Sequence, residues 1–409
     1  MLEHPNARVR PTIAPTVRIV PAPGSGLDLD EAIFSARLLS FTYEDTDDDP
    51  PEVRLEFEAA SGSLVRTETL ALGLDLQISW GYPDSKAIRD VTIRTVAGIG
   101  SGSGGSKIEY VGRPTKLDRL HQNAGPALAG LPVFENMTAS AVAREIAGLV
   151  DLTGASTLIE DTEQVYPLLA MRSNETPFQF MRRLAKLHNF TWGVSQSTFH
   201  FHSRGFQPPP AVALLASGGP DVLEWKVEGD LTVYSPSEVT VKGYDPKERH
   251  VIVSEHRPEG PVAVAMIDIG PFSAGAPAVG GARQNLVARE TISTGDARNK
   301  AGLKAARLLR ARADRQWKLN LRTIGYPDIM ARTWIDFAGA GGWVDGRWYV
   351  RGVKHTIDGG GYITEILEAT RRGAGAAAAP LEHGDVSETR PDGQTVVSGY
   401  NRIPGAAGR

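Results

Sequence analysis

Hydrophobic and polar positions alternate along the first third of the chain, which indicates β-strands. The clearest example is Leu74–Trp80, where every second residue is apolar and the residues between are polar. A period of two is typical of a strand with one buried and one solvated face. Five further segments show strand patterns. They are Thr16–Val20, Ala36–Tyr43, Val53–Phe57, Val91–Val96 and Lys107–Val111.

Helical spacing replaces this alternation further along the chain. Thr138–Leu149 predicts a helix, because Val142, Ile146 and Leu149 recur at intervals of three and four residues. Asp296–Ala313 predicts a longer, alanine-rich helix with its small apolar residues along one stripe.

Thr176–His188 predicts another helix and carries a clear start signal. Thr176 suits the N-cap, Pro177 suits the first helical position, and Gln179 completes a capping box. The apolar face of this helix consists of Phe178, Met181, Leu184 and Ala185. Residues 191–202 then predict a β-hairpin around a polar turn.

The second half of the chain returns to strand patterns. The predicted strands are Leu223–Lys226, Val239–Gly243, His250–Ser254, Val262–Asp268, Trp317–Leu321, Trp334–Phe337, Arg347–Ile357 and Tyr362–Glu368. The tetrapeptide Gly-Tyr-Pro-Asp at Gly81 recurs at Gly325, but the flanking patterns do not align, so we predict no internal repeat. From Arg372 onward the chain is rich in Gly, Ala and polar residues without periodicity, which predicts a disordered or partner-dependent tail.

Length and composition narrow the class of protein. A chain of 409 residues, of which 41% are hydrophobic, is long enough for two to four domains with sizeable cores. The net charge of −4 argues against a dedicated nucleic-acid binder and against attraction to anionic membranes. The absence of cysteine excludes disulfides, thiolate catalysis and cysteine metal sites. We see no signal peptide and no apolar run of membrane-spanning length, so we expect a soluble protein made in the cytoplasm without a membrane anchor.

Two loops resemble ligand-binding sequences. Gly100–Gly105 matches the spacing of a dinucleotide-binding loop, but a strand pattern follows where the pyrophosphate would need a helix N-terminus. We therefore expect a hairpin loop there. The acidic run Asp45–Asp49, followed by Glu56, resembles parts of a calcium loop, but Pro50 stands where the sharp turn needs glycine. We expect a solvated acidic turn.

His200 and His202 alternate on a predicted strand, a spacing that zinc sites also use. No third ligand is evident nearby, so we expect both histidines to face water. Phe199 and Phe201 would then point into the core. Three tryptophans near the C-terminal end are expected to pack in a sheet rather than stack on bases. They are Trp334, Trp343 and Trp348. No nucleophile-elbow, zinc-protease or phosphate-loop sequence is present, so we predict no catalytic, cofactor-binding or metal-binding residues.

Met171–Phe201 combines a polar start with Glu and Phe, a helix with Arg-Leu-Ala at its centre, and a short hairpin ending in Phe-His-Phe. This combination resembles the hallmark of the phage late control protein D family, and a similar element occurs in the hub part of type VI secretion spike proteins. Further stretches agree with that family in their order along the chain. They are Thr138–Ala147, Val239–Pro246 and Asp345–Ile357 with Gly361–Thr364. The resemblance covers about Thr16 to Thr370.

The resemblance implies an α+β, mainly β protein. Two domains related to the tail tube subunit, 1–118 and 220–371, would flank an inserted small α/β domain at 119–219, with a flexible tail at 372–409. It implies a structural baseplate hub of a contractile phage tail or injection particle, not an enzyme. It further implies a homotrimer between the hexameric tail tube and a trimeric spike, with baseplate wedge or tape-measure proteins as neighbours. Because the sequence continues into neither an OB fold nor a needle, we expect the spike to be a separate polypeptide.

Symmetry adds a condition to this hypothesis. Two β blocks, about Thr16–Leu117 and Leu223–Thr370, would let three chains present six similar surfaces to the tube. We expect the blocks to form separate sheets, because a single sheet would remove the sixfold match. We also expect a polar lumen that is not strongly basic, because DNA or other cargo must pass through it.

Two alternative functions stay open. A tail-associated enzyme such as a peptidoglycan hydrolase would need a catalytic constellation in a pocket. A tail tube, sheath or initiator protein would be built on a single barrel, and Leu120–Arg204 is longer than such a barrel requires.

Overall fold

The computed structural model describes residues 14–22, 38–58, 72–99, 107–122, 133–172, 175–195, 198–203, 212–216, 221–229, 238–245, 250–256, 285–289, 317–341, 344–371, 386–389 and 395–398. The chain divides into two compact units. The larger comprises residues 1–186, 190–226 and 319–369, and the smaller comprises 187–189, 227–318 and 370–409. The described part is mainly β, which confirms the predicted class.

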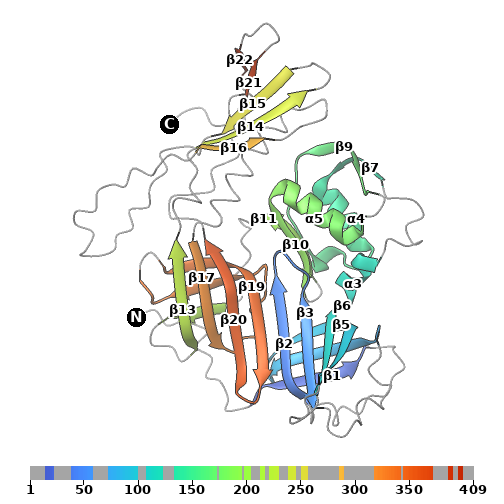
Figure 1. Ribbon diagram of the computed structural model, residues 1–409, viewed down its shortest axis with the longest axis vertical. Coiled ribbons are helices and arrows are strands. Elements are labelled where there is room, and N and C mark those ends of the chain that lie inside the picture. Colours follow the sequence, from blue (N-terminus) through green and yellow to red (C-terminus); the bar gives the residue numbers. More distant parts are fainter. Residues whose placement is uncertain are drawn as a thin grey trace, which may run out of the picture. The chain divides into compact units, whose positions relative to one another are not determined.

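The larger unit is built on a curled sheet of twelve strands (Figure 1). The first block contributes β1 (Thr16–Pro21), β2 (Leu38–Thr46), β3 (Glu52–Glu58), β4 (Asp75–Tyr82), β5 (Ser85–Ile99) and β6 (Lys107–Pro114). The second contributes β12 (Val212–Leu215), β13 (Val222–Gly229), β17 (Trp317–Ile324), β18 (Trp334–Ala338), β19 (Gly346–Asp358) and β20 (Gly361–Arg371). The main strand order is β1-β4-β5-β6-β3-β2-β19-β20-β17-β13, and β18, paired with β12, attaches to β19.

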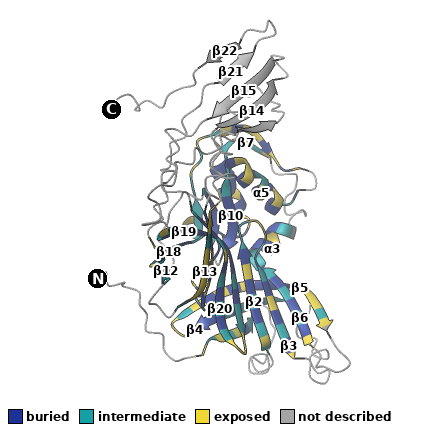
Figure 2. Ribbon diagram, turned by 60° about the vertical axis from the view of Figure 1, so that its left-hand side comes forward, coloured by how far each residue is buried: buried dark blue, intermediate teal, exposed yellow. Residues whose placement is uncertain are grey.

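The alternating pattern of the sequence produces the core under these strands. Leu76, Ile78 and Trp80 of β4 have no exposed surface, as their spacing predicted. Figure 2 shows buried positions alternating with more exposed ones along the strands. Met330 and Tyr362 from the second block belong to the same core as the first-block residues. The two blocks are therefore not independent of each other in packing.

The blocks are also joined edge to edge, so the prediction of two separate sheets is wrong. β2 and β19 pair antiparallel, from Phe41 opposite Ile357 to Thr46 opposite Gly352. Alternation along a strand indicates which face is buried, but it carries no information about which strand lies alongside. Two strands with exposed edges and a shared buried face can therefore join without any signal in their own sequences.

The curl of the sheet brings the two Gly-Tyr-Pro-Asp tetrapeptides together. The Ser85 hydroxyl, next to the first tetrapeptide, donates to Oδ2 of Asp328 in the second at 3.0 Å. A Cβ on Gly81 would lie 3.0 Å from Cγ of Pro327 and 2.4 Å from the carbonyl oxygen of Ser85. Gly81 also has φ +124°, a conformation that favours glycine. The segment after β17 thus contacts the β4–β5 turn.

The inserted part of the chain forms a smaller layer of helices and short strands within the larger unit. Its elements are α3 (Thr115–Gln122), β7 (Val133–Thr138), α4 (Ala139–Gly148), the 3-10 helix η2 (Gly154–Ser156), β8 (Thr157–Ile159), β9 (Val165–Ala170), α5 (Pro177–His188), β10 (Phe190–Ser195) and β11 (Thr198–Ser203). β10, β11 and β8 form one sheet, and β7 and β9 form a two-stranded ribbon. The two helices and the hairpin predicted here are confirmed.

The N-termini of the helices form as the sequence predicted. The Thr138 hydroxyl accepts from the backbone N–H of Ala141 and caps α4. At α5 the capping box is complete, because the backbone N–H of Gln179 donates to the Thr176 hydroxyl at 3.2 Å and the Gln179 side chain accepts from the Thr176 N–H at 3.1 Å. The apolar face of α5 is buried in the core of the insert. Its members Phe178, Met181, Leu184 and Ala185 are all at most 7% exposed.

The smaller unit contains a five-stranded sheet with the order β16-β14-β15-β21-β22. Its strands are β14 (Glu238–Asp245), β15 (His250–His256), β16 (Asn285–Arg289), β21 (Val386–Thr389) and β22 (Thr395–Ser398). The predicted second barrel, 220–371, therefore does not correspond to one sheet, although the predicted domain boundaries themselves stay predictions.

The predicted flexible tail contributes strands to this sheet, because β15 pairs antiparallel with β21. Over residues 386–389 and 395–398 the expectation of a disordered tail is therefore wrong. A strand of four residues is too short to show a reliable period, which is why the sequence did not reveal it. The predicted helix Asp296–Ala313, the predicted strand Val262–Asp268 and the loop Gly100–Gly105 lie outside the described residues.

Candidate functional site

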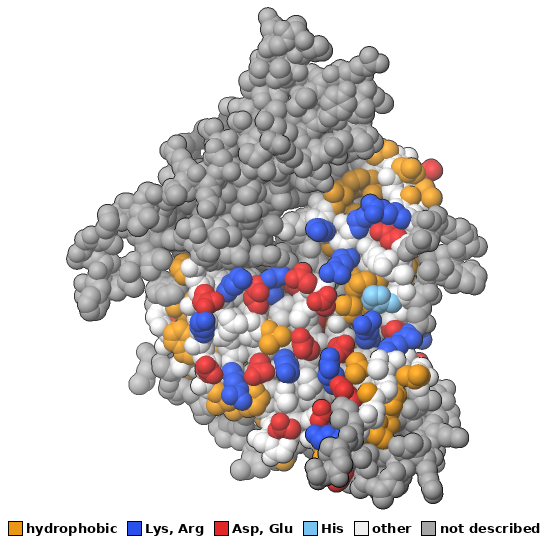
Figure 3. Space-filling model, in the orientation of Figure 1, with side chains coloured by type: hydrophobic (Ala, Val, Ile, Leu, Met, Phe, Trp, Pro, Cys, Tyr) orange, Lys and Arg blue, Asp and Glu red, His pale blue; other side chains and the backbone are white. Residues whose placement is uncertain are grey.

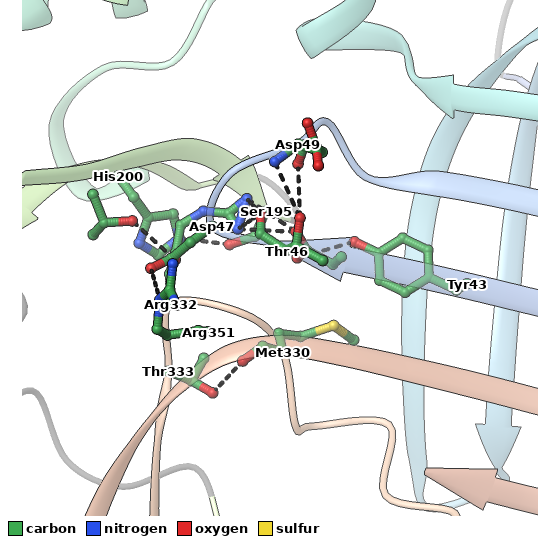
Figure 4. A network of polar contacts seen from close by, with 12 residues as sticks. Tyr43, Thr46, Asp47, Asp49, Ser195, His200, Met330, Arg332, Thr333 and Arg351 are labelled. Carbon is green, nitrogen blue, oxygen red and sulfur yellow. Dashed lines mark hydrogen bonds and ion pairs between the residues drawn. The ribbon is translucent and has the colours of Figure 1, made fainter. Parts of the chain in front are cut away.

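Four charged side chains are buried where the acidic turn after β2, the hairpin β10–β11 and the segments around β18 and β19 meet (Figure 4). They are Asp45, Asp47, Arg332 and Arg351, and we call them the buried charge network. Their side chains are between 0 and 7% exposed. Ions removed from water in this way need partners, so the network has a definite geometry.

Asp45 and Arg332 form the inner ion pair of the network. Both terminal nitrogens of Arg332 lie 2.9 Å from Oδ1 of Asp45, and both lie 3.2 Å from the carbonyl oxygen of Thr46. Arg332 has φ +66°, and its backbone N–H donates to the carbonyl of Val350. A charged side chain on a left-handed backbone position is held there by these bonds, because the conformation itself is unfavourable for arginine.

The hairpin of the insert lies directly against the Arg332 guanidinium. A Cβ on Gly193 of β10 would lie 2.4 Å from Nε of Arg332 and 2.8 Å from its Cζ. No real side-chain atom tolerates such distances, so the close approach of hairpin and guanidinium requires glycine at this position.

Asp47 and Arg351 form the outer part of the network. Oδ1 of Asp47 accepts from the Tyr349 hydroxyl at 2.8 Å and from the Thr191 hydroxyl at 3.1 Å. Asp47 Oδ2 lies 3.6 Å from Nε of Arg351. Arg351 also forms ion pairs with Asp48, at 2.8 Å, and with Glu368. Asp47 therefore connects the hairpin, through Thr191, to strand β19.

The acidic turn is thus only partly solvated, which corrects the expectation from the sequence. Asp48 and Asp49 have side chains that are 63% and 77% exposed, whereas Asp45 and Asp47 are buried. Glu56 lies on β3 with Lys107 at 3.6 Å, so it does not complete a calcium loop. Burial of these aspartates was not predictable from the sequence, because the arginines that neutralise them are about 300 residues away along the chain.

The expectation that His200 and His202 face water is also wrong, because they are 6% and 0% exposed. Nε2 of His200 lies 2.5 Å from the Ser195 hydroxyl, and Nδ1 of His202 lies 3.0 Å from the carbonyl oxygen of Ser203. The His202 ring also lies 5.9 Å from that of Trp334. Phe199 and Phe201 are buried as predicted. Both faces of the hairpin are therefore covered, one by the insert core and the other by the large sheet.

Burial sets the ionisation of these groups. It raises the pKa of Asp45, although the guanidinium of Arg332 opposes the shift. Burial alone would lower the pKa of Arg332, but the carboxylates of Asp45 and Asp47 outweigh it and raise that pKa. Burial lowers the pKa of His200 far below its ordinary range, and His202 and Arg332 add to the shift. Burial also lowers the pKa of His202, so both histidines are neutral at pH 7.

The network does not have the arrangement of a reaction centre. Ser195 and His200 touch like a nucleophile and its base, but both are buried, and among the described residues no group orients His200 through its Nδ1. A shallow hollow beside the network is lined by Asp47, Trp192 and Arg332, among others. In the described ranges no group of three or more His, Cys, Asp or Glu side chains is placed to hold a metal ion.

The remaining sequence candidates are placed as follows. Trp334 and Trp348 are buried in the sheet as predicted. Trp343 lies outside the described residues. Arg332 and Arg351 were missed. Arg351 carried a signal, since a charge within Tyr-Val-Arg-Gly-Val on a buried strand calls for a partner.

The described helices do not meet the requirements of a membrane span. None of them has the length and apolar character needed to span a bilayer.

The fold is shared with phage tail proteins of known structure. The 43 kDa tail protein of prophage MuSo2 from Shewanella oneidensis is similar with a TM-score of 0.58 at 12% identity, covering 88% of this chain and 98% of that chain. A tail protein from Neisseria meningitidis MC58 is similar with a TM-score of 0.57 at 13% identity, covering 88% and 97%. No protein-family model and no curated protein matches the sequence. At such low identity the likeness is one of fold.

Proposed function

We propose that this chain is a structural protein of a contractile phage tail or related injection machine and serves there as the baseplate hub. The observation that carries the proposal is the fold, which is shared over 88% of the chain with two phage tail proteins and covers 98% and 97% of them. The motifs that resemble the late control protein D family favour the hub over other tail components.

The buried charge network supports a structural role. Its ions neutralise one another away from water and connect the insert to the large sheet through Thr191 and Gly193. Such a network fixes the relative position of two packed parts, and it leaves no activated group at the surface. It favours a structural tail component over an enzyme.

We accordingly predict that the chain lacks catalytic activity. The reason is that Ser195 and His200, which touch like a nucleophile and its base, are both buried in the protein. Purified full-length chain in a peptidoglycan gel should leave no cleared band. A cleared band that disappears in Ser195→Ala would contradict this prediction and favour the tail-associated hydrolase.

The single sheet changes how a ring of chains would have to close. Two separate barrels were the basis for matching six tube subunits with three chains, and the single sheet removes that basis. The ends of the sheet offer another contact, because β1 and β13 each have one neighbouring strand in the main path of described strands. Exposed strand edges are templates for pairing with another chain. We propose a homotrimer closed head to tail through β1 of one copy and β13 of the next.

The outward face of the sheet supports the proposed lumen. Positive and negative side chains are interspersed over it (Figure 3), and several are paired across strands. Arg54 lies 3.2 Å from Glu109, Lys107 lies 3.6 Å from Glu56, and Arg322 lies 3.7 Å from Glu365. Paired charges leave little net positive potential, so a polyanion passing this face would not be retained.

Labelling of assembled particles tests the proposal. A C-terminal tag on the full chain should give extra density in cryo-EM maps at the end of the tail tube, next to a spike formed by another polypeptide. Three copies in one ring are expected, with tube, wedge or tape-measure proteins as neighbours. A chain found along the sheath, or absent from purified particles, would contradict the hub, whereas another copy number would contradict the trimer alone.

A further inference from the structure

The two-stranded ribbon β7–β9 has apolar side chains on a face that no other described residue of the larger unit covers. Val133, Val165 and Leu168 are 50%, 56% and 59% exposed. Pro167 and Ala170 are exposed on the same ribbon. Part of this surface is visible as an apolar patch over the insert in Figure 3. Contiguous apolar surface of this kind marks interaction sites in soluble proteins.

The other face of the ribbon is already packed. Tyr166 and Leu169 are 8% and 7% exposed and belong to the core of the insert, and Phe134 packs against the same core. The run Val165–Ala170, Val-Tyr-Pro-Leu-Leu-Ala, is apolar at every position. Continuous apolar runs are typical of strands covered on both faces. The sequence of β9 is therefore suited to a covering layer on each face, and the described residues of the larger unit supply only the layer under Tyr166 and Leu169.

Strand addition at the edge of the ribbon is disfavoured. Pro167 in the middle of β9 has no N–H to donate to a neighbouring strand. Opposite it, Asn136 has φ +53° and interrupts the regular pairing, which continues between Glu135 and Leu168 on one side and Met137 and Tyr166 on the other. A partner would consequently pack on the face of the ribbon.

The dimensions of the ribbon favour a helix as the covering element. β7 and β9 have six residues each, so the ribbon is about 20 Å long. Two strands about 5 Å apart present a face roughly as wide as one helix, whose diameter is about 10 Å. A helix of about 13 residues has the same length as the ribbon, at about 1.5 Å per residue.

The charges around the apolar face indicate the chemistry of that helix. Glu135 lies opposite Leu168 in the ribbon and Glu163 is exposed just before β9, whereas Asp161 is already paired with Arg144. We propose that the outward face of β7–β9 is a docking site for an amphipathic helix of another protein of the tail assembly, with an apolar stripe flanked by Lys or Arg. This inference rests on the proposed function, because it needs the assembled particle to supply the partner.

Site-specific photo-crosslinking in assembled particles tests the inference. A photoreactive residue replaces Leu168 in the full chain, and the control replaces Ile88, an isolated residue on β5 with 51% exposure. The expected product from position 168 is a crosslink to a helical segment of another tail protein with Lys or Arg beside its apolar stripe, in much higher yield than from position 88. A crosslink to the chain itself or to a second copy, or no crosslink at all, overturns the inference.

A binding measurement separates packing from chance proximity. The probe is a synthetic peptide with the sequence of the crosslinked segment, titrated against full-length chain. Leu168→Asp should raise Kd by at least about tenfold, and Ile88→Asp should leave it unchanged. If circular dichroism shows that Leu168→Asp does not fold, Leu168→Ser replaces it in the titration. Equal Kd values for wild type and both Leu168 variants overturn the inference. Absence of the chain from tail particles would instead refute the proposed function.

Discussion

The charged side chains buried near the contact between the insert and the large sheet depend on their partners. In the buried charge network each guanidinium meets a carboxylate within the protein, as Arg332 does with Asp45 at 2.9 Å. Desolvation of the two ions offsets much of their attraction, so the intact pair contributes little net stability. Loss of one partner is different, because the remaining ion stays buried without compensation.

Asp45→Asn should therefore lower the free energy of unfolding by about 3–5 kcal/mol, because Arg332 would stay buried without its carboxylate. Urea denaturation of the purified chain, followed by tryptophan fluorescence, measures the change. The double variant Asp45→Leu with Arg332→Met should lose clearly less free energy of unfolding than the sum of the losses in Asp45→Leu and Arg332→Met alone. Asp49→Asn is the control, because its side chain is 77% exposed and its loss should change stability by less than about 0.5 kcal/mol.

His355 gives the larger unit a definite dependence on pH. It has no exposed surface, its Nε2 donates to the carbonyl of Ile329 at 2.8 Å, and its Nδ1 accepts from the Tyr362 hydroxyl at 2.8 Å. Burial lowers the pKa of His355 from 6.5 to about 3. Between these pH values the unfolded chain takes up a proton that the folded protein does not. The contribution of neutral His355 to the free energy of unfolding is thus fully present above about pH 6.5 and is lost as the pH falls toward 3.

The wild-type chain should accordingly lose stability by up to about 1.4 kcal/mol per pH unit from this group on acidification. His355→Gln should be less stable at pH 7 but should show a shallower fall over the same range. Urea midpoints from about pH 7 to about pH 4 measure both slopes. Comparison with the variant removes the contribution of the carboxylates, including Asp45, whose raised pKa acts in the opposite direction. Parallel slopes would show that His355 does not titrate as described.

Helix α5 illustrates what can be predicted at the scale of one element. Its start depends on residues three positions apart, and its buried face on spacings of three and four, so all the determining contacts are local. These features were predictable from the sequence for that reason. The hairpin β10–β11 was predictable from local sequence in the same way. The burial of His200 and His202 was not predictable, because it depends on distant residues around Arg332.

Two substitutions in α5 separate capping from packing. Thr176→Ala removes the hydroxyl that accepts from Gln179 and should cost about 1 kcal/mol. Leu184→Ala empties a core position that is 2% exposed and should cost roughly 2–5 kcal/mol. Both are measured by urea unfolding, and Lys186→Ala, at an exposed position of the same helix, is expected to be nearly neutral. If Leu184→Ala were as mild as Lys186→Ala, the assignment of the buried face would be wrong.

The whole molecule depends on pairings between segments that are far apart in sequence. β2 joins β19, and β15 joins β21, across separations that no local pattern encodes. The strands themselves were largely predictable from alternation, whereas their neighbours were not, because every exposed strand edge offers the same backbone groups. This is why the two β blocks were expected apart and the tail was expected to be disordered.

The C-terminal strands β21 and β22 complete the sheet of the smaller unit. A chain ending at Arg371 lacks β21 and β22, so β15 loses the neighbour that pairs with Val251–Ser254. Backbone amides of 250–256 should then exchange with deuterium much faster, whereas β2 and β19 in the larger unit should keep their protection. A chain ending at Ser398 keeps both strands and is the matched control. Equal exchange of 250–256 in the two truncations would show that β21 does not stabilise the smaller unit. Loss of protection in β2 and β19 would instead mean that the larger unit depends on the tail.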